Sequence, residues 1–349
     1  MLTIVALTLC IIAGPATSYT LSVLILDFEE EFDVTRTYSG SLFSFRNVAS
    51  FGTQGILGFF LLKLRPQVWL VFSVLFHCVG MLAASFANDF SIVCLTYGFL
   101  AGCGSGSAYL IVQSVIPALY PEHVATMTGF IFSGMGIGFV VWGSFLRYVS
   151  DAYGWRSCLR LAAALSCALS VPVLLCPLRF RSEKKSRKEK SKDKNTKLWV
   201  DKKRAFISNI NDRNLIVLLV DILITVIASI GIFGHVFAFY DESSMTKAEV
   251  DSVMLAIGVA NIIGRPLLGT IADKVGKHLT LVVVQFVLSA LVTTWFLTDA
   301  SGVGAVVWST FFGLFISGFW PVVAGCIYEL VGRRYFSRTF GFASLISFL

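Results

Sequence analysis

The sequence predicts an all-α polytopic membrane protein, planned as two sets of six helices joined by a basic loop. Hydrophobic residues make up 56% of the 349 residues and charged residues 14%, against about 25% charged in an ordinary soluble domain. The mean hydropathy is +0.78. Apolar runs recur along the chain at lengths close to the ~20 residues that cross a bilayer as a helix. This composition excludes a soluble enzyme.

Apolar runs between charged residues place the individual spans. The first six are predicted at residues 2–26, 40–62, 68–87, 91–119, 128–149 and 157–178. Four more are predicted at 214–239, 249–271, 279–298 and 304–331. Residues 341–349 have the character of the first two turns of an eleventh. We expect about ten complete transmembrane helices, with helices 11 and 12 of the plan missing, as in a truncated product.

The spans divide the chain into two halves. An N-terminal six-helix half covers residues 1–178, and an incomplete C-terminal half, with helices 7–10 and the start of helix 11, covers 214–349. The loop 179–213 between them holds 14 of the 28 Lys and Arg residues and 5 of the 21 Asp and Glu residues. Its net charge of +9 (14 − 5) accounts for the basic balance of the chain, so a nucleic-acid partner is not expected. The loop is expected to attract anionic membrane lipids.

The distribution of Lys and Arg predicts the orientation, because positive residues in short loops mark the cytoplasmic side. If the N-terminus is inside, the outer short loops hold Arg36, Arg156 and Lys247, and also Arg147 if the outer end of the fifth span is included. The inner short loops then hold more basic residues, namely Lys63, Arg65, Lys274, Lys277, Arg333, Arg334 and Arg338. We therefore expect an integral membrane protein, in the plasma membrane, with its N-terminus and the loop 179–213 in the cytoplasm.

The sequence contains no motif typical of catalysis or of cofactor binding. There is no nucleotide-binding loop, nucleophile triad or metal-ligand spacing. All eight cysteines fall in apolar stretches without a C-x-x-C pair, which is typical of small packing residues. We expect neither an enzyme nor a bound metal or cofactor.

A charged motif follows the eighth span. The segment G-T-I-A-D-K-V-G-K resembles the loop signature G-x-x-x-D-[RK]-x-G-[RK] of the major facilitator superfamily, whose two halves are related by a pseudo-twofold axis. Its aspartate is expected to bond to the neighbouring helix, and its second glycine to allow a tight turn. After the second span, the corresponding loop keeps only Gly58 and a base. The gating motif residues are Gly269, Asp273, Lys274, Gly276 and Lys277.

Further segments resemble the monocarboxylate transporters within that superfamily. They are L-I-L-D-F-E-E-E-F-D-V-T-R from Leu24, Y-P-E-H-V-A-T-M-T-G-F-I-F-S-G from Tyr120, G-R-P-L-L-G from Gly264 and E-L-V-G-R-R-Y-F-S-R-T-F-G from Glu329. The resemblance runs from about Met1 to Leu349 and identifies the chain as a divergent member of that family. It implies the 6+6 helix fold, alternating access around a midplane site, and a small organic carboxylate as substrate.

The chain departs from the proton-coupled lactate carriers of that family at three positions. Tyr19 stands where they have a lysine, Asn261 where they have an aspartate, and Ala324 where they have a gating phenylalanine. Arg265 is kept. Transport of lactate with a proton is therefore less expected than transport of another carboxylate.

Two charged residues lie deep in predicted spans. Arg265 precedes Asp273 by eight residues, and Asp221 follows Arg213 by eight, so each sits roughly 12 Å inside at 1.5 Å per residue. An unpaired guanidinium at that depth costs at least ~2.5 kcal/mol, and its planar fork suits a carboxylate. Asp221 is predicted to be its resting counter-ion; an interhelical ion pair and a packing aspartate are the structural alternatives. The candidate substrate-binding residues are Arg265, Asp221, Asn261 and Tyr19.

Other polar positions are assigned to gating or packing. Glu329, at the end of the tenth span beside two arginines, is expected to join an inner-gate charge network. In Trp320-Pro321 the proline is expected to break the helix near mid-membrane, where a gating helix bends. His77 is interpreted as a satisfied core residue. Arg46 is interpreted as snorkelling to the interface, with a place in the outer vestibule as the alternative.

The sequence thus predicts a secondary transporter that moves a small organic carboxylate by alternating access. A facilitative carrier of amino-acid-like or aromatic solutes is one alternative, and a transport-dead regulatory or truncated paralogue is another. The expected partners are a small organic anion, with or without a proton, membrane lipids, and a single-span ancillary subunit.

Overall fold

The computed structural model describes residues 2–61, 66–175, 213–241, 245–295 and 302–347 of the chain. Within these ranges the chain is helical and contains no strand, which confirms the all-α prediction. The basic loop 179–213 lies outside the described residues except for its last residue, Arg213. Seven helices of the described chain are long and apolar enough to cross a membrane.

The first predicted span, 2–26, is not the continuous helix that was expected. Helix α1 (Leu2–Ala13) ends before Pro15, and a 3-10 helix, η1 (Pro15–Thr20), leads into α2 (Leu21–Phe32). Proline has no backbone N–H to donate to the preceding turn, so the regular hydrogen-bond ladder is interrupted at this point. The first crossing segment therefore has a non-α-helical stretch in its middle.

The fourth crossing segment is also irregular. It comprises α5 (Phe90–Val93), the π-helix η3 (Cys94–Leu100) and α6 (Ala101–Leu119). Asp89 caps its start by accepting from the Ser91 N–H at 2.6 Å. Regular helices α3 (Arg36–Phe60) and α4 (Pro66–Ala84) precede it.

Two long helices each contain two predicted spans, and each is broken at a glycine. The break in α7 (Val124–Leu175) is at Gly154, with φ +78°, and the break in α12 (Gly302–Ile346) is at Gly332, with φ +64°. Glycine adopts positive φ without the steric cost of a Cβ. The expected break at Trp320-Pro321 is wrong, because α12 keeps helical torsions through Pro321 and changes direction at Gly332.

The second half also contains α9 (Arg213–Asp241), α10 (Lys247–Val275) and α11 (Lys277–Thr294). Helix α10 begins with a capping box, in which Glu249 accepts from the Thr246 N–H at 2.7 Å. It is separated from α11 by Gly276 alone, at φ +129°.

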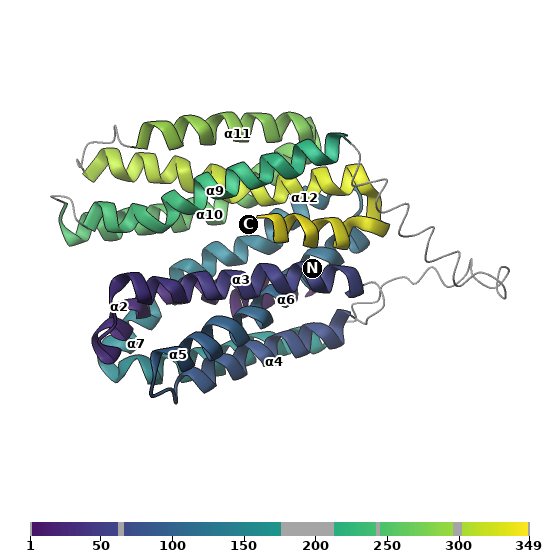
Figure 1. Cartoon of the computed structure of the whole chain (residues 1–349). Coiled ribbons are helices and arrows are strands. Elements are labelled where there is room, and N and C mark those ends of the chain that lie inside the picture. The colour runs from purple at the N-terminus through teal and green to yellow at the C-terminus, as the bar shows by residue number, and fades with distance from the viewer. Residues whose placement is uncertain (1, 62–65, 176–212, 242–244, 296–301, 348–349) are drawn as a thin grey trace, which may run out of the picture.

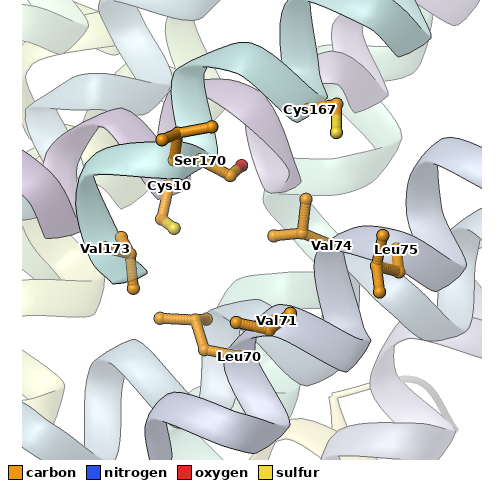
Figure 2. A pocket seen from close by; sticks show the side chains of 9 residues that line it. Cys10, Leu70, Val71, Val74, Leu75, Cys167, Ser170 and Val173 are labelled. Atoms are coloured by element: carbon orange, nitrogen blue, oxygen red, sulfur yellow. The ribbon is translucent and has the colours of Figure 1, made fainter. Parts of the chain in front are cut away.

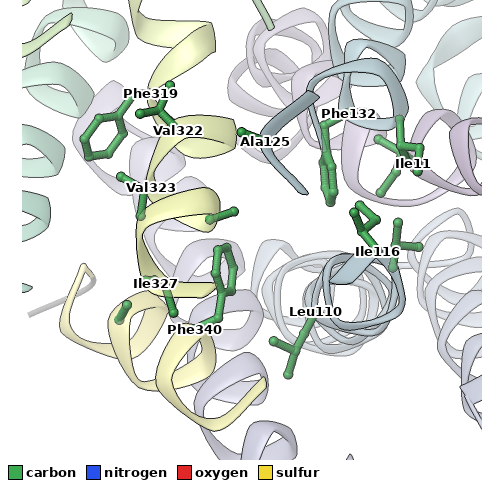
Figure 3. Close-up of a cluster of buried hydrophobic side chains, with 14 of the residues drawn as sticks. Ile11, Leu110, Ile116, Ala125, Phe132, Phe319, Val322, Val323, Ile327 and Phe340 are labelled. Carbon is green, nitrogen blue, oxygen red and sulfur yellow. The ribbon is translucent and has the colours of Figure 1, made fainter. Parts of the chain in front are cut away.

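The helices are arranged in two groups, with the purple-to-teal first half on one side and the green-to-yellow second half on the other (Figure 1). A buried apolar cluster joins them. In Figure 3, Val323 and Phe340 of α12 lie on one side of this cluster, and Phe132 of α7 and Ile116 of α6 lie on the other.

Glycines bring the two groups into backbone contact along two seams. In the α7–α10 seam, a Cβ on Gly129 would lie 2.2 Å from the Arg265 carbonyl oxygen, and one on Gly136 would lie 2.8 Å from the Ile262 nitrogen. In the α3–α12 seam, a Cβ on Gly58 would lie 2.7 Å from the Ser337 carbonyl oxygen. Small residues allow membrane helices to approach this closely, so the seams depend on them.

Candidate functional site

The candidate site is centred on Arg265, in the α7–α10 seam. Its side chain is 4% exposed, and its Nε donates to Oδ1 of Asn261, one turn earlier in α10, at 2.9 Å. Its Nη1 is buried and has no hydrogen-bond partner among the described residues. A carboxylate oxygen is the acceptor that suits such a donor best.

Asp221 is not the counter-ion of Arg265, contrary to the sequence prediction. No carboxylate among the described residues lies within 4 Å of the guanidinium. Asp221 instead accepts from Gln285 Nε2 of α11 at 2.8 Å. The depth calculation places a residue along the helix axis only, and it contains no information on which face of α9 the side chain occupies.

Asp221 lines a separate cavity of about 520 Å³ between α9 and α11. Arg213, His278 and Gln285 also line it, and the second carboxylate oxygen of Asp221 is buried without a partner in the described part of the chain. This cavity has polar groups of both signs, but Arg265 does not contribute to it.

Aromatic side chains bridge the two halves within the apolar cluster. The rings of Tyr109 and Phe132 are 4.5 Å apart between centroids, those of Tyr109 and Phe340 are 6.3 Å apart, and those of Trp320 and Phe340 are 6.0 Å apart. These residues come from α6, α7 and α12. Trp320 thus lies in a packed aromatic cluster and not at a helix break.

The charged motif at the end of α10 connects the halves. Oδ2 of Asp273 accepts from the backbone N–H of Thr126, in the first turn of α7, at 2.8 Å. Lys277 Nζ lies 3.9 Å from Asp273 and 3.5 Å from Glu329. Glu329 is therefore paired with Lys277 of the charged motif.

The other motif residues have distinct positions. A Cβ on Gly269 would lie 2.4 Å from the Ala125 carbonyl oxygen, so this glycine permits the contact with α7. Gly276 occupies the positive-φ turn, and Lys274 is exposed. Tyr19 lies in η1, and its side chain is outside the described part of the structure.

Sequence reasoning missed the bonding of Arg46, which makes three side-chain hydrogen bonds to described residues. Arg46 neither snorkels nor faces a vestibule, because it is 1% exposed and donates to Thr17, Ser18 and the Tyr97 carbonyl. His77 is confirmed as a satisfied core residue, with both ring nitrogens bonded. A charged residue in an apolar span was the signal available, but its partners lie on other helices.

A small cavity of about 90 Å³ between α1, α4 and α7 does not suit a carboxylate. Figure 2 shows Leu70, Val74 and Val173 facing it, with the Cys10 thiol and the Ser170 hydroxyl nearby. Among the residues that the structure describes, no charged side chain lines it. Its lining is that of a packing defect between helices.

Two groups of apolar helices, with a buried arginine at one seam and charged residues at its end, define a helical membrane protein of the transporter class. The chain belongs to the Major Facilitator Superfamily, whose family model matches residues 7–349. Members of that family are transporters and not enzymes. The chain is accordingly an integral membrane protein.

Individual relatives are distant. Human monocarboxylate transporter 10 is 24% identical over 273 residues, which is 76% of this chain and 52% of that protein. An agnestins efflux protein of Paecilomyces divaricatus is 23% identical over 345 residues, which is 93% of this chain and 74% of that protein. The chain spans about half the length of the first of these relatives.

The solved structure of the major facilitator transporter FucP in its outward conformation has the same fold. Its TM-score to this chain is 0.71 at 16% identity, over 98% of this chain and 88% of that one. This likeness establishes the helix arrangement and carries no information on the substrate.

Proposed function

We propose that the protein is a secondary transporter of a small organic carboxylate and that Arg265 binds the carboxylate. The observation that carries the proposal is the buried, unpartnered Nη1 of Arg265. A bound carboxylate would supply the missing acceptor and the missing negative charge together.

Asn261 supports this role by fixing the guanidinium from one side. Its amide oxygen accepts the hydrogen bond from Nε, which leaves the Nη groups for a ligand. Because an amide carries no charge, it orients the arginine without neutralising it. Proton coupling through an acid at this position is therefore not part of the proposal, whereas Asp221 could still contribute to transport from its own cavity.

The aromatic cluster favours a second candidate, a carrier of amino-acid-like or aromatic solutes. Tyr109, Phe132 and Phe340 lie where the two halves meet, and aromatic side chains favour stacking with an aromatic ring. Such a substrate would still present its carboxylate to Arg265. A transport-dead paralogue is the remaining alternative.

Alternating access would use the two seams as gates. Asp273, Lys277 and Glu329 would act at the end of the α7–α10 seam, and Gly269 would permit its closure. Orientation by the positive-inside rule puts this end in the cytoplasm. The division into 1–178, 179–213 and 214–349 then corresponds to two moving halves and a cytoplasmic loop in a plasma-membrane protein.

Partners beyond the solute follow from the same proposal. The loop 179–213 would contact anionic lipids through its net positive charge, and a single-span subunit could accompany the protein.

Labelling of an engineered cysteine at Ser191 with an impermeant reagent tests the orientation. The loop should be labelled only after the membrane is permeabilised.

An uptake screen tests the function. Cells expressing the protein are offered radiolabelled pyruvate, lactate, phenylpyruvate and phenylalanine at an acidic and a neutral external pH. Uptake of at least one carboxylate above that of vector-only cells is expected. Uptake indistinguishable from vector-only cells for every solute, with normal surface expression, would favour the transport-dead alternative.

A further inference from the structure

Two irregular stretches of membrane-crossing backbone meet in the first half. They are η1 (Pro15–Thr20) in the first crossing segment and the π-helix η3 (Cys94–Leu100) in the fourth. Backbone that leaves the α-helical ladder inside a membrane must have its polar groups satisfied within the protein, and π-helical insertions occur often at functional sites. The groups that bond these stretches are therefore of interest.

One side chain bonds both stretches. Arg46, in α3, donates from Nε to Ser18 Oγ at 3.1 Å and from Nη2 to Thr17 Oγ1 at 3.3 Å, both in η1. Its Nη1 donates to the Tyr97 carbonyl of η3 at 3.2 Å, and its guanidinium lies 4.7 Å from the centroid of the Tyr97 ring. The three bonds come from three different guanidinium nitrogens, whereas a lysine carries all its N–H donors on one nitrogen.

A second connection runs through His77, in α4. Its Nε2 lies 2.9 Å from Thr17 Oγ1, and its Nδ1 lies 3.1 Å from the Ala101 carbonyl, directly after η3. The Tyr97 hydroxyl also donates to the Thr17 carbonyl at 3.3 Å. Thr17 is therefore bonded from α3, α4 and η3 at once.

No carboxylate among the described residues lies within 4 Å of Arg46. Its partners are hydroxyls and a carbonyl, and its side chain is 1% exposed. The arginine is thus not half of an ion pair. Its contacts consist of directed bonds to the two irregular stretches.

The position of η1 is connected to the candidate site through α7. A Cβ on Gly138 would lie 2.3 Å from Ala16 Cβ of η1, and one on Gly136 would lie 3.1 Å from the Asn261 carbonyl carbon. The contact with η1 and the contact with the residue that orients Arg265 are therefore only two positions apart in α7. A shift of η1 would press on α7 at the height of the site.

We propose that Arg46 is a positioning residue for transport. It fixes the stretch Pro15–Thr20 against η3, and this stretch in turn fixes α7 beside Asn261. The proposal rests on the transport function, because it assigns Arg46 an effect on the affinity of the Arg265 site.

Hydrogen–deuterium exchange of the purified protein tests the positioning directly and needs no substrate. In Arg46→Gln, backbone exchange in a peptide covering residues 14–20 should rise about tenfold, as expected when about 1.4 kcal/mol of hydrogen bonding is lost locally. Arg46→Lys should show most of this rise although it keeps the charge. The matched control is Arg160→Gln, because Arg160 also bonds a serine hydroxyl and lies over a ring, but is exposed. That control should leave the peptide unchanged.

A second pair of variants covers the case in which Arg46→Gln does not fold. Thr17→Val removes the shared hydroxyl at similar volume and should raise exchange in the same peptide, whereas Thr17→Ser should keep the parent rate. Unchanged exchange in folded Arg46→Gln, or in Thr17→Val, would overturn the proposal. So would a rise spread evenly over all helices.

Transport kinetics provide the readout that general destabilisation would not give. With the solute of the uptake screen that the parent takes up best, Arg46→Lys should raise KM more than it lowers the maximal rate per surface molecule. A fall in maximal rate alone would contradict the proposal. If the parent takes up none of the four solutes of the uptake screen, the proposed function fails while the exchange result still decides the structural role of Arg46.

Discussion

The carboxylate of Asp273, near the end of α10, accepts a hydrogen bond from the backbone N–H of Thr126, in the first turn of α7, at 2.8 Å. The first turn of a helix has N–H groups without intrahelical partners and a partial positive charge. An acid of the second half therefore caps a helix of the first half. This bond joins the two halves at the end of the seam that contains Arg265.

Loss of this charge should weaken the contact between the halves. Asp273→Asn should destabilise the protein by about 1 kcal/mol, the usual value of a charged group at a helix N-terminus. Thermal unfolding in detergent measures the effect. Asp151→Asn is the control, since Asp151 forms an exposed pair with Arg147 within α7, and an equal shift in both variants would contradict this role of Asp273.

Backbone contact in the α7–α10 seam predicts a marked difference between two glycines of α7. A methyl group at Gly129 would lie 2.2 Å from the Arg265 carbonyl oxygen, whereas one at Gly143 would meet nothing within 4 Å. Gly129→Ala should cost about 1–3 kcal/mol through overpacking. Gly143→Ala should be neutral or slightly stabilising, and thermal unfolding of the two variants side by side checks the difference.

The turn between α10 and α11 predicts a cost without any clash. A Cβ at Gly276 would meet nothing within 4 Å, but the residue has φ +129°. Gly276→Ala should therefore destabilise by more than about 1 kcal/mol through backbone strain alone. Gly52→Ala, which is equally uncrowded within α3, is the control, and a similar unfolding temperature for the two variants would count against the strain.

Acidification should weaken the ion pair between Glu31 of α2 and Arg156 of α7. Arg156 Nη1 lies 2.6 Å from Glu31 Oε1, and this hydrogen bond lowers the pKa of Glu31 below its ordinary value. A lowered pKa gives stability that is present above the ordinary glutamate pKa and is lost as the pH falls through the lowered one. The unfolding temperature of the parent should therefore fall more on acidification than that of Glu31→Gln, and parallel pH profiles would refute this. Glu30→Gln changes the preceding residue of α2 and keeps Glu31, so its unfolding temperature should fall on acidification as much as that of the parent.

The hydropathy pattern and the charged residues between apolar runs predicted the class of fold, because a bilayer requires apolar segments of a set length. They did not predict the interruptions. Pro15 breaks its segment, whereas Pro321 lies in a helix with regular torsions, and a sequence cannot distinguish a proline whose helix is supported by neighbours from one whose helix is not. The sequence likewise does not indicate which of its many glycines adopts a positive φ, as Gly332 does.

The candidate site was predicted in part. Arg265 and Asn261 are four residues apart on one helix, so their contact follows from helical periodicity. The pairing of Asp221 with Gln285, and of Arg46 with Thr17 and Tyr97, joins segments far apart in the chain. Those contacts depend on helix packing, which depth in the membrane does not specify.

The most direct test of the central proposal is uptake by Arg265→Lys, normalised to the protein at the cell surface. The solute is the carboxylate that the parent transports best in the screen. The variant keeps the charge but loses the planar fork, so its uptake should fall to the level of vector-only cells while surface expression stays normal. Uptake by Arg265→Lys at the parent rate would show that Arg265 does not bind the substrate carboxylate.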